Sequence, residues 1–293
     1  MKKTWGYAEE RYLLSLDVMV VVLFAAILHA GWNALVRASS YKFLDAVLIV
    51  AGAGVWMAFL LPVVPRPAVE SWPYLAASVM IHVAYFTLVA FSYRSGELSF
   101  VYPLMRGAAP ALTAVAGALF INDSLSPGGW AGVLLVSCGV LVLVGDAWRS
   151  GTFRASAALF ALANAGVIVL YTLVDGQGAR LSGHALSYTG WMFLLTAPLL
   201  LAIAAAGQGR VVFERIRLGW RRGLLGGACT LASYGLALWA MTRAPIALVA
   251  ALRETSVVFA AIMAAAFLKE PITRLRYASI VTVCAGAVAM KVF

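Results

Sequence analysis

The sequence predicts an all-α integral membrane protein in which ten transmembrane helices form two inverted five-helix repeats. Three observations favour this fold class. First, 63% of the 293 residues are hydrophobic and only 12% are charged, with a mean hydropathy of +0.92, whereas soluble domains are about half apolar and about a quarter charged. Second, the chain holds ten apolar runs of the length that a membrane-crossing helix needs, about 20 residues. Third, its second half repeats features of its first.

The ten runs follow one another through short connections, none of which is long enough for a soluble domain. Their continuous hydrophobicity excludes a transmembrane β-barrel, whose strands alternate apolar and polar residues. We expect an N-terminal tail over 1–15 and a linker over 147–152. In chain order, the predicted spans are 16–36, 42–62, 72–94, 98–121, 128–145, 153–174, 184–206, 219–241, 246–268 and 273–291.

The chain repeats itself after a shift of 147 residues. Each repeat, 16–146 and 153–293, contains five predicted spans. Because five is odd, the second repeat must enter the membrane from the opposite side. Inverted repeats of this kind are the architecture of many secondary transporters, which bind their solute between the repeats near the midplane. A duplicated bundle without transport function is the alternative. The shift places Arg106 on Arg253, Asp123 on Glu270 and Gly139 on Gly286.

Polar side chains inside the spans are the candidates for a substrate-binding site. Several of them share a helical face, as His29 and Asn33 do at a spacing of four residues. A single Tyr or Asn in a span can equally serve only as a hydrogen bond between helices. In chain order, the candidates are His29, Asn33, His82, Tyr85, Tyr102, Arg106, Tyr171, Asp175, Tyr234, Arg253 and Glu254.

Arg106 and Arg253 are the least expected of these residues, because each lies deep in an apolar run. A charge near the bilayer centre costs about 3 kcal/mol or more, so such residues usually face a cavity or a partner. We expect both to face a cleft and to hold an anion, which suits the planar guanidinium group. Arg106→Leu would then keep or raise stability. The alternative is an ion pair across helices with a carboxylate such as Glu254 or Asp175, and Arg106→Leu would then cost about 3–5 kcal/mol.

His29 and Asp175 are the predicted carriers of a coupled proton, because each can titrate without leaving a permanent charge in lipid. On this hypothesis, Asp175→Asn or His29→Gln uncouples transport from pH while solute binding remains measurable.

Catalytic chemistry is not indicated. The sequence contains no HExxH, GxSxG or Walker A motif, so we expect no catalytic residues. The three cysteines, Cys138, Cys229 and Cys284, lie in apolar runs without ligand spacing, and we expect no metal and no cofactor. The net charge of +10 is attributed to loops that face anionic lipid head groups rather than to binding of nucleic acid.

Four stretches resemble the drug/metabolite transporter superfamily, specifically its EamA-type ten-helix members, and this resemblance covers nearly the whole chain. They are "HAGWNALVR" at 29–37, "LFINDSLSPGGWAGVLLVSCGVLV" at 119–142, "YTLVDGQGAR" at 171–180 and "FLKEPITRLRYASIVTVCAGAVA" at 267–289. "FINDS" departs from the usual Leu-Gly-Glu-type end of the fourth span, which "FLKEP" keeps in the second repeat. The resemblance implies export or import of amino acids, nucleotide sugars, sugar phosphates or other small metabolites.

The leading hypothesis is therefore a secondary transporter, an exporter of a small polar metabolite such as an amino acid or a related organic anion. It would work by alternating access between the repeats. An integral-membrane enzyme acting on a lipid-linked or phosphorylated substrate is the alternative, and a structural or assembly subunit is the third. The expected partners are a solute bearing a carboxylate or phosphate and membrane lipid, with no nucleic acid, and a homodimer remains open. The expected location is the bacterial inner membrane.

The orientation of the chain in the membrane stays open. If the N-terminus is cytoplasmic, the connections on that side hold 7 Lys and Arg, against 13 on the other side. The positive-inside rule thus favours both termini outside, whereas the family resemblance implies both inside.

Overall fold

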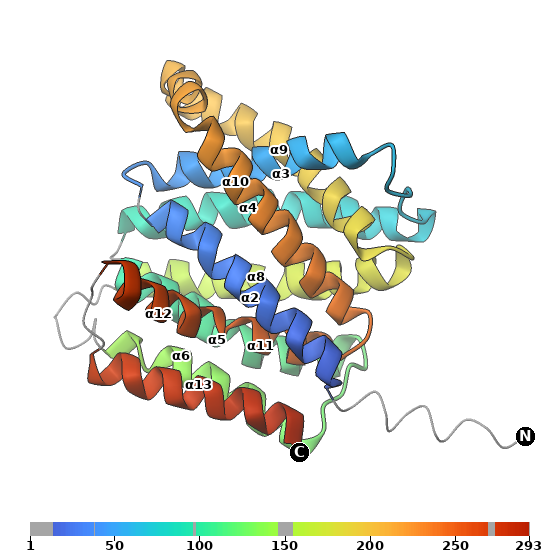
Figure 1. The fold of residues 1–293 in the computed structure, drawn as a ribbon, viewed down its shortest axis with the longest axis vertical. Helices are drawn as coiled ribbons and strands as arrows, with labels where there is room; N and C mark the ends of the chain where they lie inside the picture. The colour runs from blue at the N-terminus through green and yellow to red at the C-terminus, as the bar shows by residue number, and fades with distance from the viewer. Residues whose placement is uncertain (1–13, 38, 96–97, 146–154, 269–272, 293) are drawn as a thin grey trace, which may run out of the picture.

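The structure, a computed structural model, describes residues 14–37, 39–95, 98–145, 155–268 and 273–292. Within these ranges it is helical and contains no strand (Figure 1). A short 3₁₀ helix, η1 (Val69–Ser71), precedes the third long helix. The α-helices are α2 (Leu16–Arg37), α3 (Lys42–Leu60), α4 (Trp72–Ser95), α5 (Leu98–Phe120), α6 (Pro127–Leu141), α8 (Ala155–Leu181), α9 (Ala185–Gln208), α10 (Arg210–Met241), α11 (Ile246–Arg253), α12 (Ser256–Leu268) and α13 (Arg274–Val292).

These helices confirm the ten predicted spans. Eight stretches of helix are long and apolar enough to cross a membrane, and α4 and the shorter α6 complete the set. Most helices begin and end within a few residues of the predicted runs. The predicted N-terminal tail and the linker over 147–152 lie almost wholly outside the described residues, as does Glu270.

The ninth span differs from the continuous helix that was predicted over 246–268, because it breaks into α11 and α12. At the break, the backbone N–H of Glu254 bonds to Ala251 and that of Thr255 bonds to Leu252, which are the tight i→i−3 bonds of a 3₁₀ turn. The hydroxyl of Thr255 also donates to the carbonyl oxygen of Leu252 at 2.7 Å. A threonine hydroxyl that bonds locally to the backbone competes with helical hydrogen bonding. The hydrophobic pattern of the run does not reveal this break.

Equivalent helices of the two repeats make equivalent contacts. The eighth span, α10, packs on α2 and α3, and its counterpart α4 packs on α8 and α9. The two last spans, α6 and α13, pack on each other. In Figure 1, α2 runs from right to left, whereas α8 runs from left to right, so the repeats enter the bilayer from opposite sides.

The ends of the repeats show the same inversion at the level of residues. Gly132 of α6 lies against Gly286 and Met290, and Gly139 lies against Val283. Residue numbers therefore run in opposite directions along this contact, and α6 and α13 are antiparallel.

Small residues allow α3 and α10 to cross almost backbone to backbone. A Cβ placed on Gly52 would lie 2.1 Å from the carbonyl oxygen of Gly223, and one on Gly227 would lie 2.4 Å from the backbone nitrogen of Ala53. Close contacts of this kind drive helix association in lipid, where hydrophobic burial offers no net gain between helices. Glycine is therefore required at this crossing.

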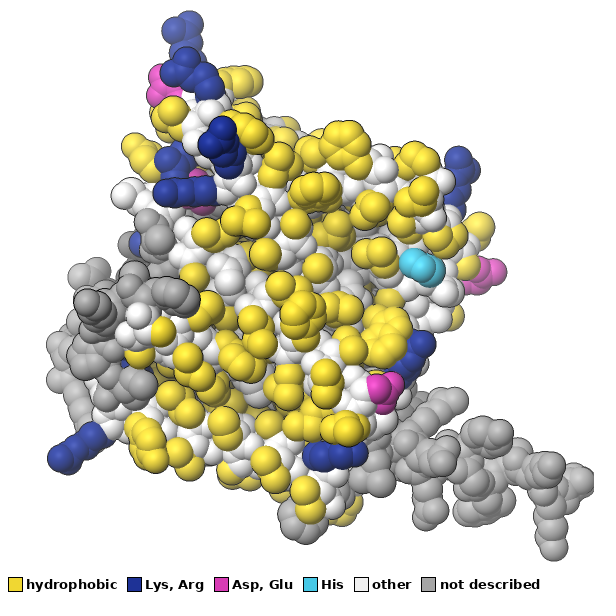
Figure 2. All heavy atoms as spheres, viewed as in Figure 1, with side chains coloured by type: hydrophobic (Ala, Val, Ile, Leu, Met, Phe, Trp, Pro, Cys, Tyr) yellow, Lys and Arg dark blue, Asp and Glu magenta, His cyan; other side chains and the backbone are white. Residues whose placement is uncertain are grey.

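The surface has the pattern of a membrane protein. Figure 2 shows hydrophobic side chains over the middle of the visible face, with Lys and Arg at its rim. The first turns of α10, which project from the top of the bundle in Figure 1, are rich in arginine, with Arg210, Arg215, Arg217, Arg221 and Arg222. This segment was predicted to precede a span at 219–241, but the helix already begins at Arg210. Arg215 fixes it by donating from Nε and Nη2 to the Asp45 carboxylate, both at 2.8 Å.

Candidate functional site

Both repeats contribute to one buried cleft. The cleft lies where α5 of the first repeat meets α8 and α11 of the second. Both predicted arginines line it, together with one carboxylate and several small or apolar side chains. Its lining consists of Arg106, Ala109, Pro110, Thr113, Ile168, Tyr171, Thr172, Ala250, Arg253 and Glu254.

Arg106 forms an ion pair with Glu254 across the two repeats. Its Nη2 lies 2.7 Å from Oε1 and its Nε donates to Oε2 at 3.0 Å, in a two-point contact. Both side chains are buried, with 4% of each residue exposed. Arg106 thus lines the cleft as expected, and it is also paired across helices, which is the arrangement that the sequence offered as the alternative. Glu254, one of the two candidate partners that the sequence offered, lies 148 residues from Arg106 in the chain and at the helix break.

A proline in α5 removes one helical hydrogen bond at Arg106. Pro110 follows Arg106 by four residues and has no N–H, so it cannot make the helical bond to the carbonyl oxygen of Arg106. The carbonyl oxygen of Arg106 therefore lacks this helical hydrogen bond, at the level of the cleft.

Arg253 occupies the equivalent position in the second repeat but is held differently. Its guanidinium lies over the ring of Tyr234, 5.2 Å from the centroid. Only 6% of Arg253 is exposed, and its buried Nε finds no hydrogen-bond partner among the described residues. With Arg106 and Glu254, it gives the cleft two positive charges against one negative charge. A buried donor without a partner and an excess positive charge are both unfavourable unless an anion or water compensates them.

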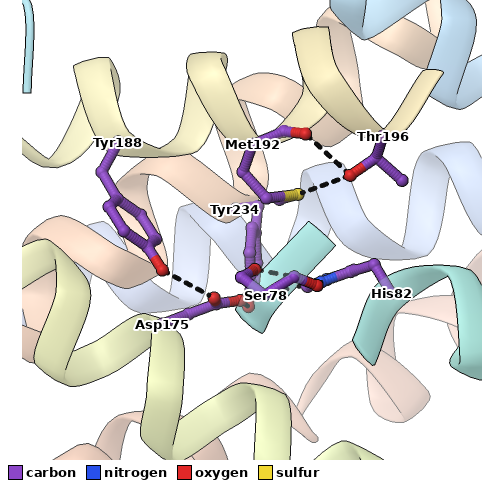
Figure 3. A network of polar contacts seen from close by, with 7 residues as sticks. All are labelled: Ser78, His82, Asp175, Tyr188, Met192, Thr196 and Tyr234. Atoms are coloured by element: carbon purple, nitrogen blue, oxygen red, sulfur yellow. Dashed lines mark hydrogen bonds and ion pairs between the residues drawn. The ribbon is translucent and has the colours of Figure 1, made fainter. Parts of the chain in front are cut away.

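Asp175 is the centre of a second polar cluster (Figure 3). It is fully buried on α8. Its Oδ1 accepts a hydrogen bond from the hydroxyl of Tyr188 at 3.1 Å, and its Oδ2 accepts one from the hydroxyl of Tyr234. His82 Nε2 lies 3.9 Å from Oδ2, and His82 Nδ1 lies 3.0 Å from the carbonyl oxygen of Ser78. No arginine pairs with Asp175 among the described residues, although the sequence offered it as a candidate partner for one.

A group of aromatic rings lies between the cleft and the Asp175 cluster. Tyr171 lines the cleft and its ring lies 4.8 Å from that of His82, 5.6 Å from that of Tyr85 and 6.3 Å from that of Tyr234. The two polar groups are thus neighbours rather than separate sites, because Tyr234 contacts Asp175 on one side and Arg253 on the other.

The candidates of the first span, His29 and Asn33, lie outside the lining of the cleft. His29 is buried and packs edge-on against Trp32 at 5.1 Å, within electrostatic reach of Arg106 and Arg253. The side-chain amide of Asn33 donates to the carbonyl oxygen of His29 at 2.8 Å, within the same helix. Tyr102 is half-buried, also within reach of Arg106.

Tyr188 and Ser78, which contact Asp175 and His82, were missed by the sequence analysis. Each is an ordinary residue of an apolar span, and only its position beside a buried carboxylate or imidazole gives it a role. Their role is therefore visible only in the folded structure, not in the sequence.

Asp123, at the acidic end of the fourth span, joins the repeats. Its Oδ2 accepts the backbone N–H of Ile246 at 2.6 Å, at the first residue of α11, as a helix-capping carboxylate does. Its Oδ1 lies 3.3 Å from Nη2 of Arg180, which also binds the carbonyl oxygens of Met241 and Ala244. This carboxylate therefore positions the helix that carries Arg253. Among the described residues, no group of three or more His, Cys, Asp or Glu could hold a metal ion.

Comparison with known proteins agrees with the fold and the repeat. A solved structure described only as "Crystal structure of protein" superposes with a TM-score of 0.70 at 18% identity, covering 93% of this chain and 94% of that one. A stretch of 74 residues, 25% of this chain, is 35% identical to the multidrug resistance protein EbrB of Bacillus subtilis (strain 168) and 34% identical to that of Bacillus atrophaeus. The match spans 62% of the length of each EbrB protein.

Residues 155–291, which form nearly all of the second repeat, match the model of the EamA-like transporter family. This family is one of transporters rather than enzymes. The resemblance to an EamA-type transporter of the drug/metabolite transporter superfamily, predicted from the sequence, is therefore confirmed over the second repeat.

Proposed function

We propose that this protein is a secondary transporter that exports a small polar metabolite bearing a carboxylate or phosphate, such as an amino acid. The observation that carries the proposal is the cleft in which Arg106 and Arg253, one from each repeat, face a single carboxylate. Sites between inverted repeats, beside a broken helix, are where secondary transporters bind their solutes, and α11 and α12 form such a broken helix.

The charges of the cleft favour an anionic group. Two guanidinium groups against one carboxylate leave one positive charge, which a solute carboxylate or phosphate would neutralise. A planar guanidinium binds such groups through two parallel hydrogen bonds, and Nε of Arg253 is without a partner. In a zwitterionic amino acid, the carboxylate would bind Arg253 and the ammonium group would lie near Glu254.

Alternating access follows from the pairing between repeats. The ion pair of Arg106 and Glu254 ties α5 of one repeat to the end of α11 in the other. A solute anion that competes with Glu254 for Arg106 would loosen this tie and let the repeats rock about the site. Export from a bacterial inner membrane agrees with the similarity to bacterial proteins named for multidrug resistance.

The proposal is tested by binding to the purified protein. Melting temperatures are measured with L-alanine, L-glutamate, succinate and inorganic phosphate, and with glycerol as an uncharged solute. At least one anion or zwitterion should raise the melting temperature of the wild type, and Arg253→Leu should remove the effect. Arg243→Leu is the matched control, because Arg243 is exposed and stacks on Trp239 outside the cleft, 4.1 Å from the ring centroid. Binding that survives in Arg253→Leu would contradict the proposal.

A further inference from the structure

We propose that His82 and Asp175 together bind one proton, and that this proton is taken up when an anion binds to the arginines of the cleft. The inference rests on the proposed function for its coupling to a solute. The proton site itself stands on the geometry of the Asp175 cluster.

The contacts of His82 indicate where its protons lie. Its Nδ1 lies 3.0 Å from the carbonyl oxygen of Ser78, which can only accept, and 3.3 Å from the Ser78 hydroxyl, which can donate or accept. The shorter carbonyl contact favours a hydrogen on Nδ1. A neutral imidazole then directs the lone pair of Nε2 towards Oδ2 of Asp175, 3.9 Å away. If both groups are deprotonated, two acceptors face each other across this gap. One added proton resolves the conflict, by forming either an imidazolium–carboxylate pair or a neutral acid beside a neutral imidazole.

Asp175 has no cationic Lys or Arg partner among the described residues. The residue is fully buried, and its two hydrogen-bond donors, Tyr188 and Tyr234, are uncharged. A buried carboxylate without a counter-charge is disfavoured, and a proton shared with His82 would supply that charge.

The elements packed around the pair supply few other charges. Tyr171 faces it from α8, Tyr188 from α9 and Tyr234 from α10. Beyond Tyr234 and Tyr171 lie the charges of the cleft: Arg253, Arg106 and Glu254.

Tyr234 connects the proton site to the cleft. Its hydroxyl donates to Asp175, and its ring lies beneath the guanidinium of Arg253. An anion bound to Arg253 adds a negative charge near the pair and favours the protonated state. By thermodynamic reciprocity, protonation of the pair must strengthen anion binding by the same factor. A solute with one net negative charge and the proton would then cross together without net charge.

His29, the other predicted proton carrier, fits this role less well. It lies within electrostatic reach of both arginines of the cleft, and it has no carboxylate partner among the described residues. A proton on His29 would place a third positive charge beside two others, whereas a proton shared by His82 and Asp175 reduces a negative charge.

The proton site is tested without any solute by infrared difference spectroscopy across a pH titration. We expect a titrating band in the wild type, from a protonated carboxyl group or from an imidazolium beside a carboxylate, its loss in Asp175→Asn, and a displaced titration midpoint in His82→Gln. Asp45→Asn is the matched control, because Asp45 is also buried but is paired with Arg215, so the band should remain. If Asp175→Asn does not fold, Tyr234→Phe retains the ring and removes one donor, and it should displace the midpoint. A titration unchanged in His82→Gln and in Asp175→Asn or Tyr234→Phe would overturn the inference.

The coupling is tested by adding L-glutamate or succinate to the protein in weak buffer with a pH indicator. We expect up to one proton taken up per bound anion, an affinity that rises by up to about tenfold per unit fall in pH, and loss of both effects in Asp175→Asn. Anion binding without proton uptake would overturn this inference and leave the proposed function intact. Absence of any anion binding would instead contradict the proposed function, while the infrared titration would still judge the proton site.

Discussion

At the scale of single residues, the structure explains why two arginines are tolerated inside apolar helices. Arg106 is matched by Glu254, and Arg253 rests on an aromatic ring with one nitrogen unpaired. The first arrangement is stabilising only while both partners remain, whereas the second leaves capacity to bind a ligand. The two equivalent positions of the repeat are therefore held differently: Arg106 is paired across the repeats, and Arg253 keeps an unpaired donor, which we propose binds the solute.

We predict that Arg106→Leu lowers stability by about 3–5 kcal/mol, because it leaves Glu254 buried without a counter-charge. For an arginine that only holds an anion in a cleft, the sequence instead predicts that Arg106→Leu keeps or raises stability. The double variant Arg106→Leu/Glu254→Leu should recover most of the loss, since no stranded charge remains. Melting curves of the three proteins decide the matter, and a single variant as stable as the wild type would contradict the ion pair.

We predict that Arg253→Lys retains only part of the anion affinity, with a loss of about tenfold, because an ammonium group cannot copy the two parallel donors of a guanidinium. The folded protein should keep its melting temperature, since the positive charge over Tyr234 is preserved. Titration calorimetry with L-glutamate measures the ratio. Equal affinities in the two proteins would show that the charge alone matters.

At the scale of elements, the crossing of α3 and α10 leaves no room for a side chain. We predict that Gly52→Ala destabilises the protein markedly, because its Cβ would lie 2.1 Å from the carbonyl oxygen of Gly223. Gly166→Ala in α8 is the matched control, since nothing lies within 4 Å of its Cβ, and alanine is the better helix former by about 1 kcal/mol. Thermal unfolding should fall in the first variant and stay or rise in the second. Equal melting temperatures would contradict the close crossing.

At the scale of the whole molecule, ten spans place the start of α2 and the end of α13 on one side of the bundle. Nζ of Lys291 donates to the carbonyl oxygen of Leu14 at 2.9 Å, which fixes this relation directly. We predict that reporters fused to the two termini are accessible from the same side of the membrane. Protease protection of sealed vesicles measures it, and protection of only one reporter would exclude an even number of spans.

Much of this architecture could be predicted from the sequence, because continuous apolar runs and an odd number of spans per repeat dictate helices and inversion. The arginines and Asp175 could be found as charges in such runs. The choice between Glu254 and Asp175 as the partner of Arg106 could not be made, because it depends on how the helices pack. Tyr188 could not be found either, because it resembles any tyrosine of a span. The break after Arg253 escaped as well, since it depends on backbone bonds of Glu254 and Thr255 that leave hydrophobic periodicity unchanged.

The central claim, that the arginines of the two repeats hold a transported anion, is tested most directly by exchange in proteoliposomes. Vesicles loaded with L-glutamate or succinate, whichever raises the melting temperature more, are diluted into the same labelled anion and its uptake is followed. We predict exchange with the wild type and Arg243→Leu, and none with Arg253→Leu. Exchange by Arg253→Leu at the rate of the wild type, or no exchange by the wild type of an anion that it binds, would contradict the claim.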